Sequence, residues 1–151
     1  MQKQSLNARA SYGMRWLTKT DGNVLNGDDD LFKIEGGPIL IMHFYGVVTT
    51  VIGGAANCTI QEAVAEPAGD VAFSTTVAID NDAAGTSYTF TAAAPSVLTP
   101  TTAGALANVP EVRWLAPIGT IQALCSAAQT GVIVWQMGFI PSANAVVTVA
   151  A

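Results

Sequence analysis

The feature that most constrains this sequence is a side-chain alternation with a period of two residues. Residues 71 to 79 and 87 to 92 alternate in this way, and residues 130 to 140 place Ile133, Trp135, Met137 and Phe139 on one face. Successive side chains of a β-strand point to opposite faces of its sheet, so this period is typical of half-buried strands. Clusters of Gly, Pro, Asn and Asp separate the runs, and helical periodicity is almost absent. The pattern therefore predicts an all-β protein.

About nine or ten strands are expected. They cover residues 12–19, 31–35, 39–52, 56–63, 71–79, 87–92, 112–115, 119–127, 130–140 and 145–151. Turns are expected at 21–22 and 26–30, and loops at 62–70, 80–85 and 93–110, the last with at most a short strand near Val97. Two packed antiparallel sheets forming a β-sandwich, or a jelly-roll-like, partly closed barrel, satisfy such a pattern.

The chain length of 151 residues corresponds to one domain. We expect residues 1–20 to form an extended N-terminal arm and residues 21–151 to form a single sandwich domain. The polar start, without an apolar stretch behind it, predicts no secretory signal peptide. No apolar run is long enough to predict a transmembrane helix. The sequence thus predicts a protein that does not interact with a membrane.

Charge is sparse, and this excludes one class of partner. The six Lys and Arg are scattered among eleven Asp and Glu, which gives a net charge of −5. Nucleic-acid binding depends on neutralising phosphates, so we expect no direct contact with nucleic acid. Only 11% of the residues are charged, against about 25% in an ordinary soluble domain. A surface of Thr, Ser, Asn, Gln, Ala and Gly is typical of a chain that contacts other proteins.

No catalytic residue is predicted. His43 is the only histidine and lies in the most apolar expected strand, where a packed or interface histidine is the simpler interpretation. No G-x-S-x-G nucleophile motif accompanies it. Three acids lie four residues apart, at Glu62, Glu66 and Asp70. Two carboxylates can serve as acid and base in glycoside hydrolysis, but clustered acids in a loop usually form a solvated face. We therefore expect a protein that is not an enzyme and needs no cofactor.

No metal site is predicted either. The acidic runs 28–30 and 80–82 lack the spacing of a calcium loop, and Asp and Asn are favoured turn formers, so a turn is the preferred interpretation and calcium remains an alternative. Cys58 and Cys125 fall on the apolar phase of their strands and are expected to be free, reduced core residues. Together with His43 they make a weak ligand set for zinc.

The chain ends favour assembly with other proteins. The last seven residues, 145–151, form an expected strand without any charged side chain, and an exposed strand of that kind invites pairing with a neighbour. Trp16 and Trp114 lie in shorter, more polar strands and are the better interface candidates among the aromatic residues. Aromatic side chains can also stack on sugars, but most of those here occupy the apolar phase of a strand, which favours core packing.

Several segments together resemble small virion proteins of tailed bacteriophages. Residues 31–39, LFKIEGGPI, are followed by YGVVTT at 45–50, and an acidic turn with Ala-Gly-Thr lies at 80–86. The later blocks are IGTI at 118–121, TGVIVW at 130–135, and Ile140–Pro141 leading to a terminal Ala-Ala. The resemblance covers roughly residues 31–151, and its specificity lies in the order of the motifs.

The resemblance implies a capsid decoration, or cement, protein. Such a protein is made in the host cytoplasm and lies on the capsid exterior of the virion, where it binds the major capsid protein and itself, here expected as a homotrimer. The expected oligomer or capsid contacts are Leu6, Tyr12, Trp16, Trp114, Val146, Val147 and Val149. Two alternatives remain open: another virion part, such as a head fibre base, tail or spike component, or a surface carbohydrate-binding module.

Overall fold

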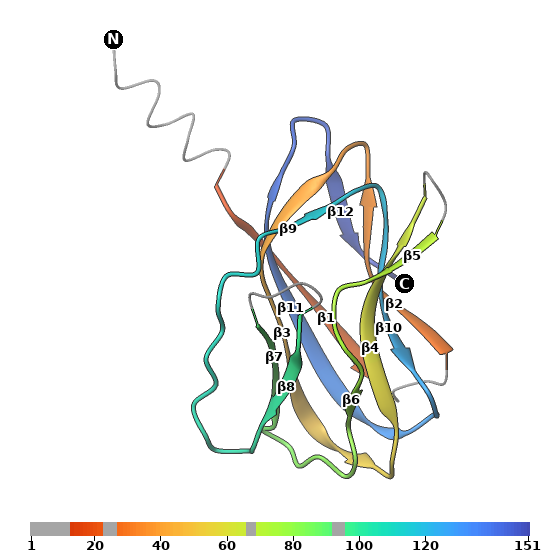
Figure 1. The fold of residues 1–151 in the computed structure, drawn as a ribbon, viewed down its shortest axis with the longest axis vertical. Coiled ribbons are helices and arrows are strands. Elements are labelled where there is room, and N and C mark those ends of the chain that lie inside the picture. Colours follow the sequence, from red (N-terminus) through yellow and green to blue (C-terminus); the bar gives the residue numbers. More distant parts are fainter. Residues whose placement is uncertain (1–12, 23–26, 66–68, 92–95) are drawn as a thin grey trace.

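The computed structural model describes residues 13–22, 27–65, 69–91 and 96–151 of the chain, and they form an all-β fold (Figure 1). Within them there are twelve strands. The strands are β1 Arg15–Gly22, β2 Gly27–Glu35, β3 Ile39–Gly53, β4 Asn57–Val64, β5 Gly69–Ala72, β6 Val77–Ala78, β7 Ser87–Phe90, β8 Leu98–Thr101, β9 Trp114–Ala116, β10 Gly119–Cys125, β11 Thr130–Pro141 and β12 Val146–Val149. No helix long and apolar enough to cross a membrane occurs in these residues.

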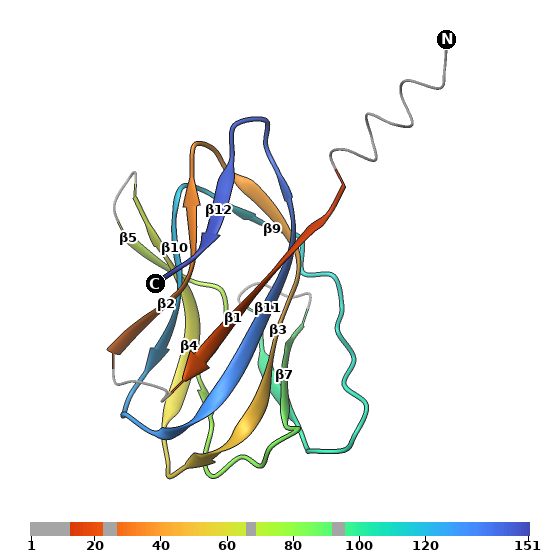
Figure 2. The ribbon, with the colours of Figure 1, turned by 180° about the vertical axis from the view of Figure 1, so that it is seen from behind.

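The strands form two sheets that pack face to face (Figures 1 and 2). Sheet A has the order β1-β11-β3-β7-β8, with β9 also paired to β3. Sheet B has the order β12-β2-β10-β4-β5, with β6 also paired to β4. All of these strand pairs are antiparallel. The predicted β-sandwich is confirmed, and the sheets do not close into a barrel.

The core lies between the sheets and is centred on aromatic residues of β3 and its neighbours. Phe44 on β3 contacts Phe32 of sheet B with ring centroids 5.9 Å apart, and it also packs on Phe90 and Trp135. Gly46 lies opposite Trp135, and a Cβ atom on Gly46 would approach the indole ring to 2.6 Å. A glycine is therefore required in the middle of this long strand because the largest core side chain occupies the space above it.

Sheet B contains a disulfide bond between Cys58 on β4 and Cys125 on β10. The expectation of two free, reduced thiols is wrong. The two residues lie directly opposite each other in the β4–β10 register, with Cα atoms 4.3 Å apart, which is typical of a non-hydrogen-bonded antiparallel pair. Their predicted position on the apolar phase is confirmed, since both are buried.

The acidic segments differ most from the sequence-based expectation. Asp21–Gly22 is not a turn but the end of β1, and residues 28–30 of the second predicted turn belong to β2, where they pair with β10. Consecutive aspartates favour a turn when only the local sequence is considered. In the fold, Gln122 on the neighbouring strand β10 donates a hydrogen bond from Nε2 to Asp30 Oδ1 at 2.7 Å, so the carboxylate of Asp30 has a partner within the sheet.

Residues 62–79 also differ from the prediction. The expected loop at 62–70 instead contains the end of β4 and the beginning of β5. The expected strand at 71–79 is divided into β5 and β6, which both pair with β4. The N–H groups of Phe73 and Ser74 both donate to the carbonyl of Ile60, and this interrupts the register between the two pairings. The alternation correctly indicates extended backbone here but does not reveal this interruption.

The N-terminal boundary also changes. β1 begins at Arg15 and pairs with β11 along its whole length, so residues 15–20 of the predicted arm form an edge strand of the sandwich. The physical reason is that Leu17 and Asp21 point inward, and Leu17 packs against the core. Residues 13–14 of the predicted arm precede β1, and residues 1–12 lie outside the described residues.

Candidate interaction surfaces

The C-terminal strand β12 forms one edge of sheet B and carries no charged side chain. It pairs with β2 on one side, and no strand among the described residues pairs with its other side. Val147 packs partly against the core, while Val146 and Val149 are 55% and 40% exposed. The uncharged terminal strand expected from the sequence is therefore present, and it lies at a sheet edge.

The backbone of β12 offers hydrogen-bonding groups at this free edge. The N–H of Ala150 donates to the carbonyl of Leu31 on the β2 side. Successive residues of a strand direct their N–H and C=O groups to alternate edges. The polar backbone groups of Val147 and Val149 consequently lie on the free edge, where an extended segment of another chain can pair with them.

The edge of sheet A nearest to β12 is built differently. β1 carries Arg15, Lys19 and Asp21 on its inward phase, opposite core residues of β11. Lys19 Nζ donates to the carbonyl of Ala150 at 2.8 Å, which ties this edge to the end of the chain just beyond β12. Inward-pointing charges are a common protection of sheet edges against pairing with another chain. The edge of β1 is thus protected against pairing with another chain, whereas the adjacent edge of β12 is open to such pairing.

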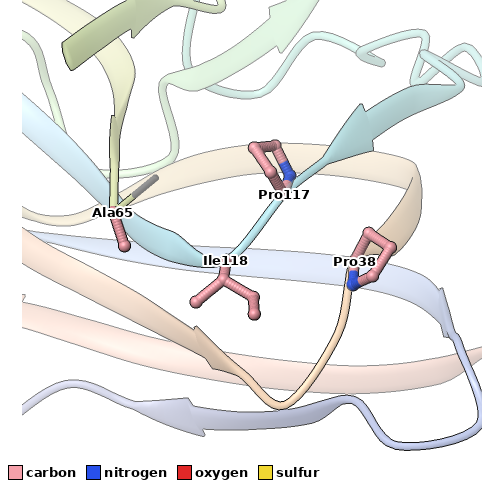
Figure 3. A pocket seen from close by; sticks show the side chains of 4 residues that line it. All are labelled: Pro38, Ala65, Pro117 and Ile118. Atoms are coloured by element: carbon pink, nitrogen blue, oxygen red, sulfur yellow. The ribbon is translucent and has the colours of Figure 1, made fainter. Parts of the chain in front are cut away.

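An apolar hollow lies at one end of the sandwich (Figure 3). It has a volume of about 270 Å³ and is lined by Pro38, Ala65, Pro117 and Ile118. The connections β2–β3 and β9–β10 and the end of β4 meet here, and Ala65 N donates to the carbonyl of Ile118. The β11–β12 turn also packs at this end, because Ser142 N donates to the carbonyl of Pro38. The hollow therefore lies near the beginning of β12.

A third surface is the outward face of sheet A, where three rings gather. Trp16 of β1 is 47% exposed and stacks on His43 of β3 with ring centroids 5.8 Å apart and planes 8° apart. A Cβ atom on Gly138 would lie 3.0 to 3.1 Å from three atoms of the Trp16 six-membered ring, so the indole lies flat over the glycine. Tyr45 meets Trp16 edge-on at 6.4 Å, and Tyr45 Oη donates to Gln136 Oε1 at 2.8 Å.

Only Trp16 among these three rings was singled out by sequence reasoning as an interface candidate. His43 was expected to be a packed or interface residue, and it packs against Trp16. Tyr45 belongs to the aromatic residues of which most were expected to pack in the core. His43 and Tyr45 lie on the phase opposite to Phe44, which is the core residue between them, and both are half-buried. The alternation around Phe44 would have identified Tyr45. The bulge between Gly138 and Phe139, opposite His43 and Ile41, cannot be read from the sequence.

The other predicted contact residues have varied positions. Trp114 is partly buried and packs on Phe73 and Phe90, with ring centroids 4.8 and 5.1 Å apart, so only part of it is accessible to a partner. Leu6 and Tyr12 lie outside the described residues. Trp16 lies on the outward face of sheet A, and Val146, Val147 and Val149 lie on the edge of sheet B. Trp16 and the three valines therefore lie on two separate surfaces, and Trp114 belongs to neither.

The acidic turn at residues 80–82 is occupied by contacts within the chain. Asp80 Oδ1 accepts from the N–H of Ala56 and Asn81 Oδ1 accepts from the N–H of Gly54, at 3.2 and 3.1 Å. Asp82 accepts a hydrogen bond from the hydroxyl of Tyr88. Within the described ranges, no three His, Cys, Asp or Glu residues are grouped as metal ligands. The turn interpretation of this run explains its side chains without a bound ion.

Two acids are buried inside the sandwich. Glu62, expected in a solvated loop, is 1% exposed on β4, and burial raises its pKa to about 7. Burial, followed by repulsion from Asp29, raises the pKa of Asp21 to about 6, although Lys19 acts in the opposite direction. Neither Glu62 Oε1 nor Asp21 Oδ2 has a hydrogen-bond partner in the described part of the chain. Asp29 and Lys19 are the charges that act on Asp21, and burial alone shifts Glu62, so the two acids are not a coupled pair of the kind that acid and base catalysis uses.

Comparison of the chain with protein-family models, with curated proteins and with solved structures finds no match.

Proposed function

We propose that this chain is a non-enzymatic structural protein of a tailed-phage virion, which binds the outside of the assembled capsid and holds neighbouring capsid subunits together. The ordered motifs over residues 31–151 support the virion assignment by resemblance. The observation that carries the mode of binding is the uncharged edge of β12, with which no strand among the described residues pairs. The protein is made in the host cytoplasm and acts on the capsid exterior.

The proposed contact is β-augmentation. An extended segment of the major capsid protein adds to sheet B beside β12 and pairs with the free backbone groups of Val147 and Val149. The side chains of Val146 and Val149 then lose their exposure to water, and the apolar hollow at Pro38 and Ile118 receives a side chain of the same partner. Repetition of this contact over the shell makes a weak single contact sufficient.

We further propose a homotrimer, because closed symmetry is a common way for small shell proteins to cover exposed strand edges. Light scattering of the purified protein tests this part of the proposal. A mass of three chains is expected, and a monomer at all accessible concentrations would contradict the trimer.

Coating of capsids by edge variants tests the proposed contact. Capsids of the parent phage that lack this protein are mixed with the native chain or with the double variant Val146→Lys, Val149→Lys, and bound protein is counted after sedimentation. Two lysines at an exposed edge oppose pairing with another strand, so occupancy should fall by at least tenfold. Leu106→Lys is the matched control, since Leu106 is fully exposed in the loop between β8 and β9. Full occupancy of the double variant would exclude β12 as the contact.

The predicted contacts Leu6 and Tyr12 need a separate test. Deletion of residues 1–12 leaves β1 intact, whereas deletion of residues 1–20 would remove most of an edge strand. Reduced coating by the shorter deletion is expected if these residues contact the capsid. Unchanged coating would remove them from the proposed contact and leave β12 as the principal site.

A further inference from the structure

The outward face of sheet A carries a continuous row of hydrogen-bonding side chains that the proposed capsid contact does not use. Direct pairing aligns the row across the five consecutive strands β1, β11, β3, β7 and β8. Its members are Thr18, Gln136, Tyr45, Thr89 and Thr99. Directly paired residues point to the same face, and four strand spacings correspond to roughly 19 Å. The row thus crosses all five strands, and Thr89, at 7% exposed, is its one buried member.

Each end of the row adjoins a different kind of surface. At one end, the flat indole of Trp16 and the parallel ring of His43 lie beside Tyr45. At the other end is an open hollow of about 240 Å³. The hollow is lined by Thr89, Phe90, Thr91, Thr99, Thr101, Asn108 and Pro110. An aromatic platform therefore continues into a hollow in which five of the seven lining residues are threonine or asparagine, together with Phe90 and Pro110.

Charge is missing from this face. The outward positions of β1, β11 and β3 in the described residues carry no Asp, Glu, Lys or Arg, because Arg15, Lys19 and Asp21 follow the inward phase of β1. Recognition of a sulfated or carboxylated ligand usually depends on ion pairs and charge-assisted hydrogen bonds. An uncharged ligand matches the face better.

We propose that this face binds a neutral polysaccharide. One side of a pyranose ring presents C–H groups that stack on a flat aromatic ring, while its hydroxyl groups donate to and accept from amides and other hydroxyls. Trp16 and His43 supply the stacking surface, and Gln136, Thr99 and Asn108 supply hydrogen-bonding groups along the row and in the hollow. An apolar protein segment in the same place would bury these hydroxyl and amide groups without partners, at a cost in free energy.

The proposal is independent of capsid binding, since it concerns sheet A and not the edge of sheet B. Native gel electrophoresis tests it, with gels that contain hydroxyethylcellulose, laminarin, galactomannan, amylopectin or, as an anionic control, alginate. Migration of the native protein should be retarded in at least one neutral gel, with the same affinity at low and high salt because the site is uncharged. No retardation in any of the neutral gels would overturn the proposal.

Variants locate the site. Trp16→Ala should weaken binding by at least about tenfold. Tyr45→Phe and Thr99→Val each remove a hydroxyl group and should weaken it by about fivefold. Val71→Ala, whose side chain is 52% exposed on β5 of sheet B, should bind normally. The binding of a variant is interpreted only if its melting temperature equals that of the native protein, so that a loss of binding does not reflect unfolding. Retention of binding by both Trp16→Ala and Thr99→Val would overturn the assignment. Conversion of an oligomer to a monomer by Trp16→Ala would also overturn it, by identifying the face as an interface with a second copy.

Discussion

The two sheets of the sandwich place their charges in opposite ways. Sheet A has an uncharged, aromatic outward face and an edge strand, β1, whose charged residues point inward. Sheet B has a polar outward face with a Lys33–Glu35 ion pair and a chain of hydrogen bonds from Gln61 through Gln122 to Asp30. Its edge strand, β12, is uncharged. Each sheet thus leaves one surface free of charge, and the two surfaces differ in kind.

This difference indicates two kinds of partner. The edge of β12 offers mainly backbone N–H and C=O groups, which recognise an extended chain with little regard to its sequence. The face of sheet A offers rings, hydroxyls and an amide of Gln136, which recognise the shape and hydroxyl pattern of a ligand. We therefore propose a protein partner for the edge and a neutral carbohydrate for the face. The predictions below separate the contributions of the two sheets.

The largest effect is expected from Phe44→Ala, because Phe44 joins the two sheets. Its ring packs on Phe32 of sheet B and on Phe90 and Trp135 of sheet A, and it is fully buried. Removal of a buried phenyl ring should lower the free energy of unfolding by about 3–5 kcal/mol. Urea denaturation measures the loss, and Leu106→Ala should change the value by less than about 0.5 kcal/mol. A loss below about 1 kcal/mol for Phe44→Ala would contradict the packing described here.

The next largest effect concerns sheet B alone. Replacement of Cys58 and Cys125 by alanine removes a link between residues 67 positions apart and should cost about 2–4 kcal/mol. Hydrogen exchange should accelerate more in β4 and β10 than in β3 and β11, because the bond joins only the former pair. Equal acceleration in both sheets would indicate that the bond acts on the whole fold. Addition of a reductant to the native protein should reproduce the effect, whereas the alanine variant should not respond to it.

The outcome for the cysteines illustrates what the sequence can predict. Alternation places Cys58 and Cys125 correctly on inward phases, but their pairing depends on the β4–β10 register, which no local pattern encodes. The all-β class and most strands follow from the same alternation. Local preferences predict a turn for the acids at 28–30 and a loop for Glu62. Pairing with β10 places all of them in strands instead. Trp16 was predicted from its polar strand as an interface candidate, whereas its neighbours on the sheet face depend on strand order.

A smaller effect, dependent on pH, is expected at Glu62. Burial raises its pKa in the folded protein from 4.5 to about 7, so the folded state holds this proton more tightly than the unfolded state. The contribution of Glu62 to the free energy of unfolding is fully present below about pH 4.5, where the carboxyl group is protonated in both states. This contribution is lost as the pH rises to about 7. Glu62→Gln should therefore stabilise the protein at pH 8 by about 1–2 kcal/mol, allowing for screening by solvent, and have almost no effect at pH 4.

Thermal or urea unfolding at both pH values provides the measurement for Glu62→Gln. Glu35→Gln is the control, because Glu35 is an exposed acid in sheet B paired with Lys33. Its effect should be small at either pH. An equal gain from Glu62→Gln at pH 4 and pH 8 would show that the carboxyl group does not titrate between them.

The smallest effect on stability is expected from Lys19→Met, which keeps most of the side-chain stem. The variant loses the hydrogen bond from Lys19 to Ala150 and should cost about 1 kcal/mol or less. It also removes one of the charges that protect the edge of β1, so association that depends on concentration should increase. Sedimentation velocity over a range of concentrations measures this association. Unchanged association would mean that Arg15 and Asp21 suffice to protect the edge.

Hydrogen exchange of the protein on capsids tests the assignment of the β12 edge most directly. Peptides that cover residues 142–151 and 13–22 are compared between the free and the capsid-bound protein. Pairing of a capsid strand with β12 should slow exchange at Val147 and Val149, whose amides lie on the free edge, and leave the peptide of β1 nearly unchanged. Protection of the β1 peptide without protection of β12 would contradict the proposed contact.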